Sequence, residues 1–111
     1  VEIDLENMKT TNLRVIAAVA GGGVPGAESS MLKIRGTEIR QEISSLARRA
    51  MGVYGRPFIA EALKDGYTGE TFGPDYASAA ASRYFNNRKL SIFGGSNEIQ
   101  KNIISKMILG L

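Results

Sequence analysis

Near the C-terminus, an aromatic residue, two glycines and a serine lead directly into an amphipathic helical pattern. Phe93 precedes Gly94 and Gly95, and Ser96 stands where the helix would begin. Glycines let the backbone turn freely and approach a ligand closely, while a serine at a helix start accepts a hydrogen bond from a following amide. Further amides at such a start would point outward unpaired and would suit a phosphate, or a ribose hydroxyl beside one. We therefore predict a nucleotide-binding corner at residues 93–98.

Several other chemistries are excluded by residue types that the chain lacks. Its 111 residues include no cysteine and no histidine, so disulfides, thiol nucleophiles, Ser–His triads and zinc sites cannot occur within them. The net charge of +3 is mild, and no basic stripe interleaves with aromatic residues as in nucleic-acid-binding proteins. No apolar run approaches the ~20 residues needed to span a membrane, and no signal peptide is evident. We expect a cytoplasmic protein that binds neither nucleic acid nor membranes.

Long helices are predicted in the first half of the chain. Apolar residues recur at three- and four-residue steps over residues 1–20, and the glycine-rich stretch that follows ends this pattern. A longer helix is expected over residues 27–51. One apolar stripe runs along it, formed by Leu32, Gly36, Ile39, Ile43, Leu46 and Ala50. Because Gly36 has no side chain and lies on this stripe, we expect two helices to pass close together there.

The second half of the chain contains two further helical patterns after a glycine-punctuated, irregular stretch at residues 52–73. Pro74 favours the first turn of a helix over residues 74–90. A fourth helix is expected over residues 97–109, with Gly110 as its C-cap. Strand signals are weak throughout. The fold class we predict is therefore all-α, an antiparallel up-and-down bundle of four main helices.

These segments resemble the C-terminal helical domain of flavin-dependent acyl-CoA dehydrogenases. Residues 91–111, SIFGGSNEIQKNIISKMILGL, are similar to the end of that domain. Residues 30–38, SMLKIRGTE, are similar to its long helix, and residues 50–55, AMGVYG, to a glycine-rich turn. The order and spacing of the four helical patterns also fit, so the resemblance covers essentially all of residues 1–111.

The resemblance implies an FAD-dependent enzyme that desaturates an acyl-CoA thioester between its α and β carbons. It further implies a homotetramer assembled through these bundles and an electron-transfer flavoprotein-like acceptor. Members of the family carry an N-terminal helical domain, a middle β-domain and a first bundle helix ahead of the segments seen here. We therefore expect that the chain is the last part of a larger protein, and that it is inactive by itself.

The resemblance implies roles for several residues at the corner. Ser96, Asn97 and Glu98 match the stretch that binds FAD, and Phe93 and Gly95 match positions that line the acyl-thioester end of the pocket. Since Glu98 would repel a phosphate, contact with a ribose hydroxyl suits it better. Two alternatives remain open from the residues alone. The helix start could be an ordinary cap with an acid in its first turn, and Phe93 could be a core aromatic.

A second set of cofactor residues is implied further upstream. Arg49, Gly52 and Val53 align with a Gln-x-x-Gly-Gly motif that commonly reaches the FAD of a neighbouring subunit. Arg49 replaces the glutamine and could still pair with the pyrophosphate through charge-assisted hydrogen bonds. Val53 replaces the second glycine, which makes a close approach of the backbone less favourable there.

The chain departs from the family at the position of the catalytic base. Many members place a glutamate directly after the aromatic residue, and here Gly94 stands at that position. Glycine has no side chain to accept a proton, so we assign no catalytic residue within the chain. Either the base is an acidic residue of the preceding bundle helix, or the chain is a non-catalytic subunit that completes the flavin site of a heteromeric enzyme.

Overall fold

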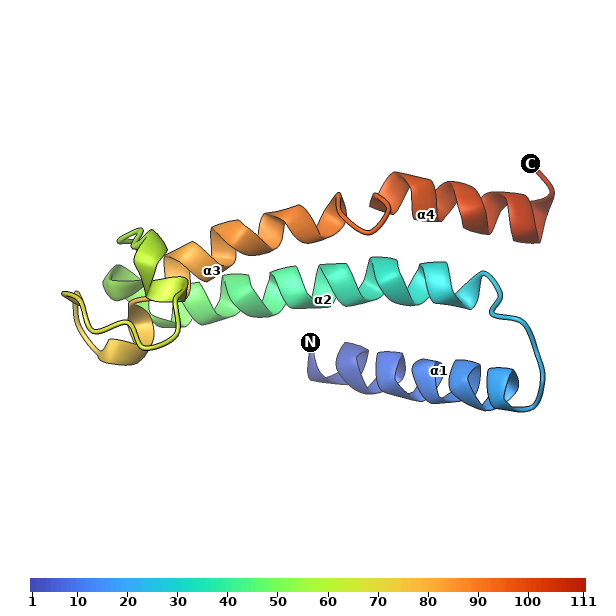
Figure 1. The fold of residues 1–111 in the computed structure, drawn as a ribbon, viewed down its shortest axis with the longest axis horizontal. Coiled ribbons are helices and arrows are strands. Elements are labelled where there is room, and N and C mark those ends of the chain that lie inside the picture. Colours follow the sequence, from blue (N-terminus) through green and yellow to red (C-terminus); the bar gives the residue numbers. More distant parts are fainter. The chain divides into compact units, whose positions relative to one another are not determined.

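The computed structural model describes all residues 1–111 and contains helices and turns but no strand, which confirms the predicted all-α class. Four α-helices form its framework: α1 (Glu2–Ala20), α2 (Glu28–Ala50), α3 (Ala80–Asn86) and α4 (Asn97–Ile104) (Figure 1). Short 3₁₀ turns occur at Gly52–Gly55, Ala60–Leu63, Asp75–Ala77 and Asn87–Ser91. No helix is both long enough and apolar enough to cross a membrane.

The chain divides into two compact units. The first comprises residues 1–39 and 90–111, and the second comprises residues 40–89. Helix α2 contributes its first half to one unit and its second half to the other.

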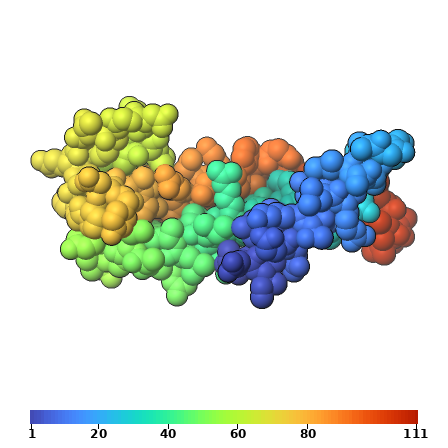
Figure 2. All heavy atoms as spheres, turned by 90° about the horizontal axis from the view of Figure 1, so that it is seen from below, coloured from blue at the N-terminus to red at the C-terminus, as the bar shows by residue number.

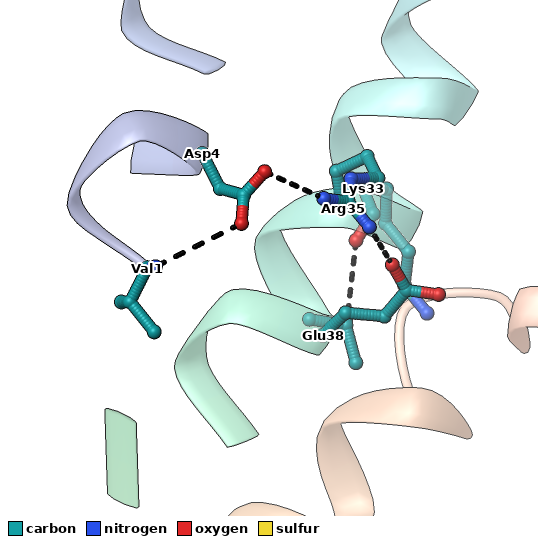
Figure 3. A network of polar contacts seen from close by, with 6 residues as sticks. Val1, Asp4, Lys33, Arg35 and Glu38 are labelled. Carbon is teal, nitrogen blue, oxygen red and sulfur yellow. Dashed lines mark hydrogen bonds and ion pairs between the residues drawn. The ribbon is translucent and has the colours of Figure 1, made fainter. Parts of the chain in front are cut away.

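In the first unit, α1 and the first half of α2 run antiparallel, and α4 lies on the other side of α2 (Figure 1). The Sδ atom of Met8 lies 3.4 Å from the position that a Cβ would take at Gly36. This contact confirms that a second helix packs over Gly36. Arg35 pairs with Asp4 of α1 at 3.1 Å and with Glu38 at 2.6 Å (Figure 3). Since all three side chains are exposed, these ion pairs add little to stability.

Few apolar side chains of the molecule are fully buried. The buried apolar residues are Ala27, Ile34, Ile39, Ala77 and Ala81. Helix α1 has no buried residue, and its side facing away from α2 is bare within the first unit (Figure 2, blue). The stripe predicted on α2 is accordingly only partly covered. Ile39 is 4% exposed, whereas Ile43 and Leu46 are 43% and 42% exposed.

In the second unit, α3 packs along the second half of α2. The Gln41 side chain donates to the backbone carbonyls of Asn87 and Arg88, at 3.2 and 3.3 Å. The Ser82 hydroxyl, 1% exposed, donates to the carbonyl of Ile59. Through this hydrogen bond α3 also fixes the irregular segment that precedes it.

The prediction of one continuous third helix over residues 74–90 is wrong. The structure has a 3₁₀ turn, α3 and a second 3₁₀ turn in its place. At the front, the Ser78 hydroxyl donates to the Asp75 carbonyl at 2.8 Å, a local bond that competes with the helical ladder. At the rear, Gln41 occupies carbonyls of the last turn. Asparagines at positions 86 and 87 also weaken the helix.

The last helical segment agrees with the sequence-based prediction. Helix α4 continues into a π-helical turn at Ser105–Leu109. Gly110 follows with φ of 70° and ψ of 22°, the left-handed conformation expected of a glycine C-cap. The helical pattern over residues 97–109 is therefore confirmed, although its final turn is wider than an α-helix.

Candidate nucleotide-binding corner

The turn before α4 has the backbone freedom that its glycines predict. Gly94 and Gly95 have φ values of 65° and 81°, in the left-handed region that other residues rarely adopt. A Cβ placed on Gly94 would meet nothing within 4 Å, whereas one on Gly95 would lie 2.6 Å from Nε2 of Gln100. One face of the turn is therefore open at Gly94, and a ligand could approach the backbone there.

Ser96 caps α4 as the sequence predicts. Its backbone is extended, with φ of −63° and ψ of 159°, and its Oγ accepts a hydrogen bond from the Ile99 amide at 3.3 Å. This bond is the helix cap that the sequence predicts.

The Glu98 carboxylate interacts with groups at the start of its own helix. The pKa of its carboxyl is lowered, mainly because the carboxylate accepts a hydrogen bond from its own backbone N–H and one from the Ser96 hydroxyl. Burial of the carboxyl opposes this shift and raises the pKa, while the charges of Lys101 and Lys33 lower it by smaller amounts. Glu98 is thus an ionised first-turn acid. Its contact with a ribose hydroxyl of a cofactor stays a prediction.

Asn97, the first residue of α4, is held from outside its helix. Lys33 of α2 donates from Nζ to the Asn97 Oδ1 at 2.8 Å, in a partly buried contact between residues 64 positions apart. One helical turn further along α2, the buried Thr37 hydroxyl lies 3.3 Å from the Leu90 carbonyl, just before the glycine turn. The first half of α2 therefore contacts the corner on both sides of the turn.

The contacts of Lys33 and Thr37 with the corner were not predicted from the sequence. The available signal was their spacing, since residues four apart share one face of a helix. That spacing alone could not indicate which segment the face would contact, because Asn97 lies far away along the chain.

Phe93 and Gly95 lie on the surface of the first unit. Phe93 is 54% exposed, so it is not an enclosed core aromatic within this unit. Its exposed ring could contribute an apolar wall to a pocket completed by other groups. Its assignment to the acyl-thioester end, like that of Gly95, stays a prediction.

Arg49, Gly52 and Val53 belong to the second unit and form their own site candidate. Arg49 lies in the last turn of α2 and is exposed. Gly52 has φ of 57°, and nothing lies within 4 Å of the position of its absent Cβ. Val53 is 63% exposed. The segment therefore offers an accessible cation beside an open glycine, while its contact with a cofactor stays a prediction.

Outside these two candidates, the structure contains a hollow but no cluster of acidic side chains. No three acidic side chains lie close enough together to hold a metal ion. A hollow of about 420 Å³ lies between α1, the turn after it and the start of α2, with Arg14, Val24 and Glu28 among its lining residues. It contains none of the site residues predicted from the sequence.

Comparison with known proteins supports the resemblance seen in the sequence. The family model described as acyl-CoA dehydrogenase, C-terminal domain, matches residues 1–109. No curated protein and no solved structure matches the chain. The matched segment includes every residue of both site candidates.

Proposed function

The chain belongs to the acyl-CoA dehydrogenase family, as a C-terminal domain, and on that basis we propose that it completes the FAD site of an enzyme that desaturates acyl-CoA thioesters. The observation that supports this most directly is the corner at residues 93–98, where an open glycine turn meets a capped helix start held by Lys33. We further propose a cytoplasmic homotetramer that passes electrons to an electron-transfer flavoprotein-like acceptor.

The groups at the corner fit the nucleotide half of FAD. The Asn97 amide, held by Lys33, supplies hydrogen-bond donors, and the open side of Gly94 allows a close approach. Glu98 is ionised and would repel a phosphate, so a ribose hydroxyl is its better partner. In the second unit, Arg49 would bind the pyrophosphate of a neighbouring subunit's cofactor.

The bound flavin would supply the acceptor for the hydride that leaves the β-carbon. The α-proton needs a carboxylate acceptor within hydrogen-bond reach, and Gly94 has no side chain to provide one. Glu98 is the nearest acid along the chain, but its hydrogen bonds at the helix start lower its pKa and make it a weak base. We therefore propose that the base is an Asp or Glu outside residues 1–111.

Flavin binding by the complete protein tests this proposal. We expect the purified protein to show flavin absorbance that bleaches when an acyl-CoA is added without oxygen. Asn97→Ala should weaken FAD binding by roughly tenfold, as expected for the loss of a hydrogen bond near charged groups. Asn102→Ala, an exposed asparagine of the same helix, serves as the control and should leave binding unchanged. A complete protein that binds no FAD would refute the proposal.

The glycine at position 94 favours a second candidate, a non-catalytic subunit that completes a partner's flavin site. The two candidates differ in where the base lies. If the complete protein binds FAD yet does not bleach with any acyl-CoA until a second, related subunit is added, the partner role is correct. Bleaching by the protein alone supports the complete enzyme.

A further inference from the structure

We propose that Lys33 is a positioning residue of the nucleotide corner, which orients the Asn97 amide so that its two N–H donors face the bound ligand. The inference rests on the proposed FAD site and assigns a role to a residue outside the motif at residues 93–98. Its physical basis is the hydrogen bond from Lys33 Nζ to Asn97 Oδ1, at 2.8 Å.

The orientation of the amide follows from the chemistry of lysine. An ammonium group has three donors and no acceptor, so it can hold only the oxygen of an asparagine side chain. With Oδ1 facing Lys33, the Nδ2 group points to the opposite side of the Cβ–Cγ axis, within the plane of the amide. A free asparagine at a helix start would sample both orientations. Held this way, Asn97 presents donors, which select phosphate, carbonyl or hydroxyl oxygens of a ligand.

Lys33 can act in this way because its surroundings limit its motion. Lys33 is partly buried, and its backbone carbonyl accepts a hydrogen bond from the Thr37 hydroxyl at 2.9 Å. Thr37 is 7% exposed and also lies beside the Leu90 carbonyl. The turn of α2 that carries the lysine is thus fixed against the segment that carries the ligand-binding residues. A lysine on an open surface would lose much more side-chain entropy in forming the same bond.

Lys101 provides a matched control. Both lysines contribute a favourable charge to Glu98, but only Lys33 hydrogen-bonds to Asn97. Lys101 is exposed on α4 itself. A variant at either position removes one positive charge from the same neighbourhood, so any excess effect at Lys33 reports on the hydrogen bond and not on net charge.

The test is a double-mutant cycle in FAD affinity with the complete protein. We expect Lys33→Met, which keeps the aliphatic stem, to weaken FAD binding by roughly tenfold. Asn97→Ala should have a similar effect, and the double variant should be no weaker than Asn97→Ala alone, because Lys33 acts through Asn97. Lys33→Arg, another donor-only side chain, should stay within about threefold of the unaltered protein, and Lys101→Met within about twofold.

Other outcomes overturn the inference. If the effects of Lys33→Met and Asn97→Ala multiply in the double variant, Lys33 acts independently of Asn97. If Lys33→Arg is as weak as Lys33→Met, a donor-only group at this position is not the cause. The melting temperatures of the FAD-free variants separate a folding defect from a binding defect, since the inference requires an affinity loss without a matching loss of stability. An unaltered protein that binds no FAD refutes the proposed function itself, whereas normal binding with independent effects refutes only the role of Lys33.

Discussion

The glycines of the corner turn have backbone angles that strain any other residue. Replacing Gly94 or Gly95 by alanine should each lower the free energy of unfolding by about 1–2 kcal/mol, the typical strain of a left-handed residue with a Cβ. At Gly95 the new Cβ would also displace the end of the flexible Gln100 side chain. Denaturant unfolding of the complete protein, monitored by circular dichroism, measures both values.

Gly36→Ala provides the comparison for these two variants. Gly36 lies within α2, where alanine gains up to about 1 kcal/mol in helix propensity. Its new Cβ would lie at ordinary contact distance from the flexible Met8 side chain. We expect this variant to be neutral or stabilising. A loss of stability at Gly36 as large as that at Gly94 would contradict the strain argument.

Glu98 should make the stability of α4 depend on pH. Its pKa is lowered from the usual value of 4.5 in the folded protein, so its stabilising effect is fully present above that value. The effect disappears as the pH falls through the lowered pKa. Glu98→Gln should therefore be less stable than the unaltered protein near neutral pH, and the two should converge in acid. Thermal melts from pH 3 to 7 test this, and a constant difference across that range would contradict it.

At the level of elements, the sequence predicted what depends on local patterns. The bounds of α1 and α2 fall within about a residue of those read from apolar periodicity, and the caps at Ser96 and Gly110 formed as their residue types indicate. The prediction of one continuous third helix was wrong because tertiary contacts set the ends of that helix. Gln41 of α2 donates hydrogen bonds to the carbonyls of Asn87 and Arg88 in the last turn of the predicted helix. No pattern within residues 74–90 reveals that partner.

Tyr84 of α3 contacts two arginines, of which Arg48 belongs to α2. The guanidinium groups of Arg48 and Arg88 lie 4.5 and 5.0 Å from the centre of the Tyr84 ring. Arg48 also has a buried Nε without a hydrogen-bond partner, so the ring face is an important compensating contact for its charge. Tyr84→Leu should lower the free energy of unfolding by about 1–2 kcal/mol, the sum of two cation–π contacts at partly exposed sites.

Tyr84→Phe is the matched control for this pair of contacts. It keeps the aromatic face and removes only the hydroxyl, so we expect it to stay within about 0.5 kcal/mol of the unaltered protein. Urea unfolding of the two variants separates the effect of the ring from that of the hydroxyl. Equal losses for Leu and Phe would show that the arginines gain nothing from the ring.

For the whole molecule, the sequence predicts the local geometry of the candidate corner but not the long-range contacts that support it. The turn and cap at residues 93–98 could be predicted because their geometry depends on contiguous residues: glycines that turn, a serine that caps and a helix that follows. Their support from Lys33 and Thr37 could not, since those contacts join residues 64 and 53 positions apart. The limited burial of the α2 stripe was also unexpected, because periodicity shows which side chains share a face but not what covers that face.

The exposed apolar face of α1 leads to the last prediction, which concerns assembly. Leu13 and Ile16 lie three residues apart on one side of the helix and are 66% and 54% exposed. Exposed apolar side chains stabilise an assembly when another subunit covers them. The homotetramer that we propose would cover this face. Leu13→Glu combined with Ile16→Glu should therefore lower the mass of the complete protein in light scattering at micromolar concentration. The helical content should not change, because neither side chain is buried within the chain. Asn12→Glu, an exposed polar neighbour, adds a charge without removing apolar surface and should leave the mass unchanged. If the double variant assembles as the unaltered protein does, this face of α1 is not part of the subunit interface.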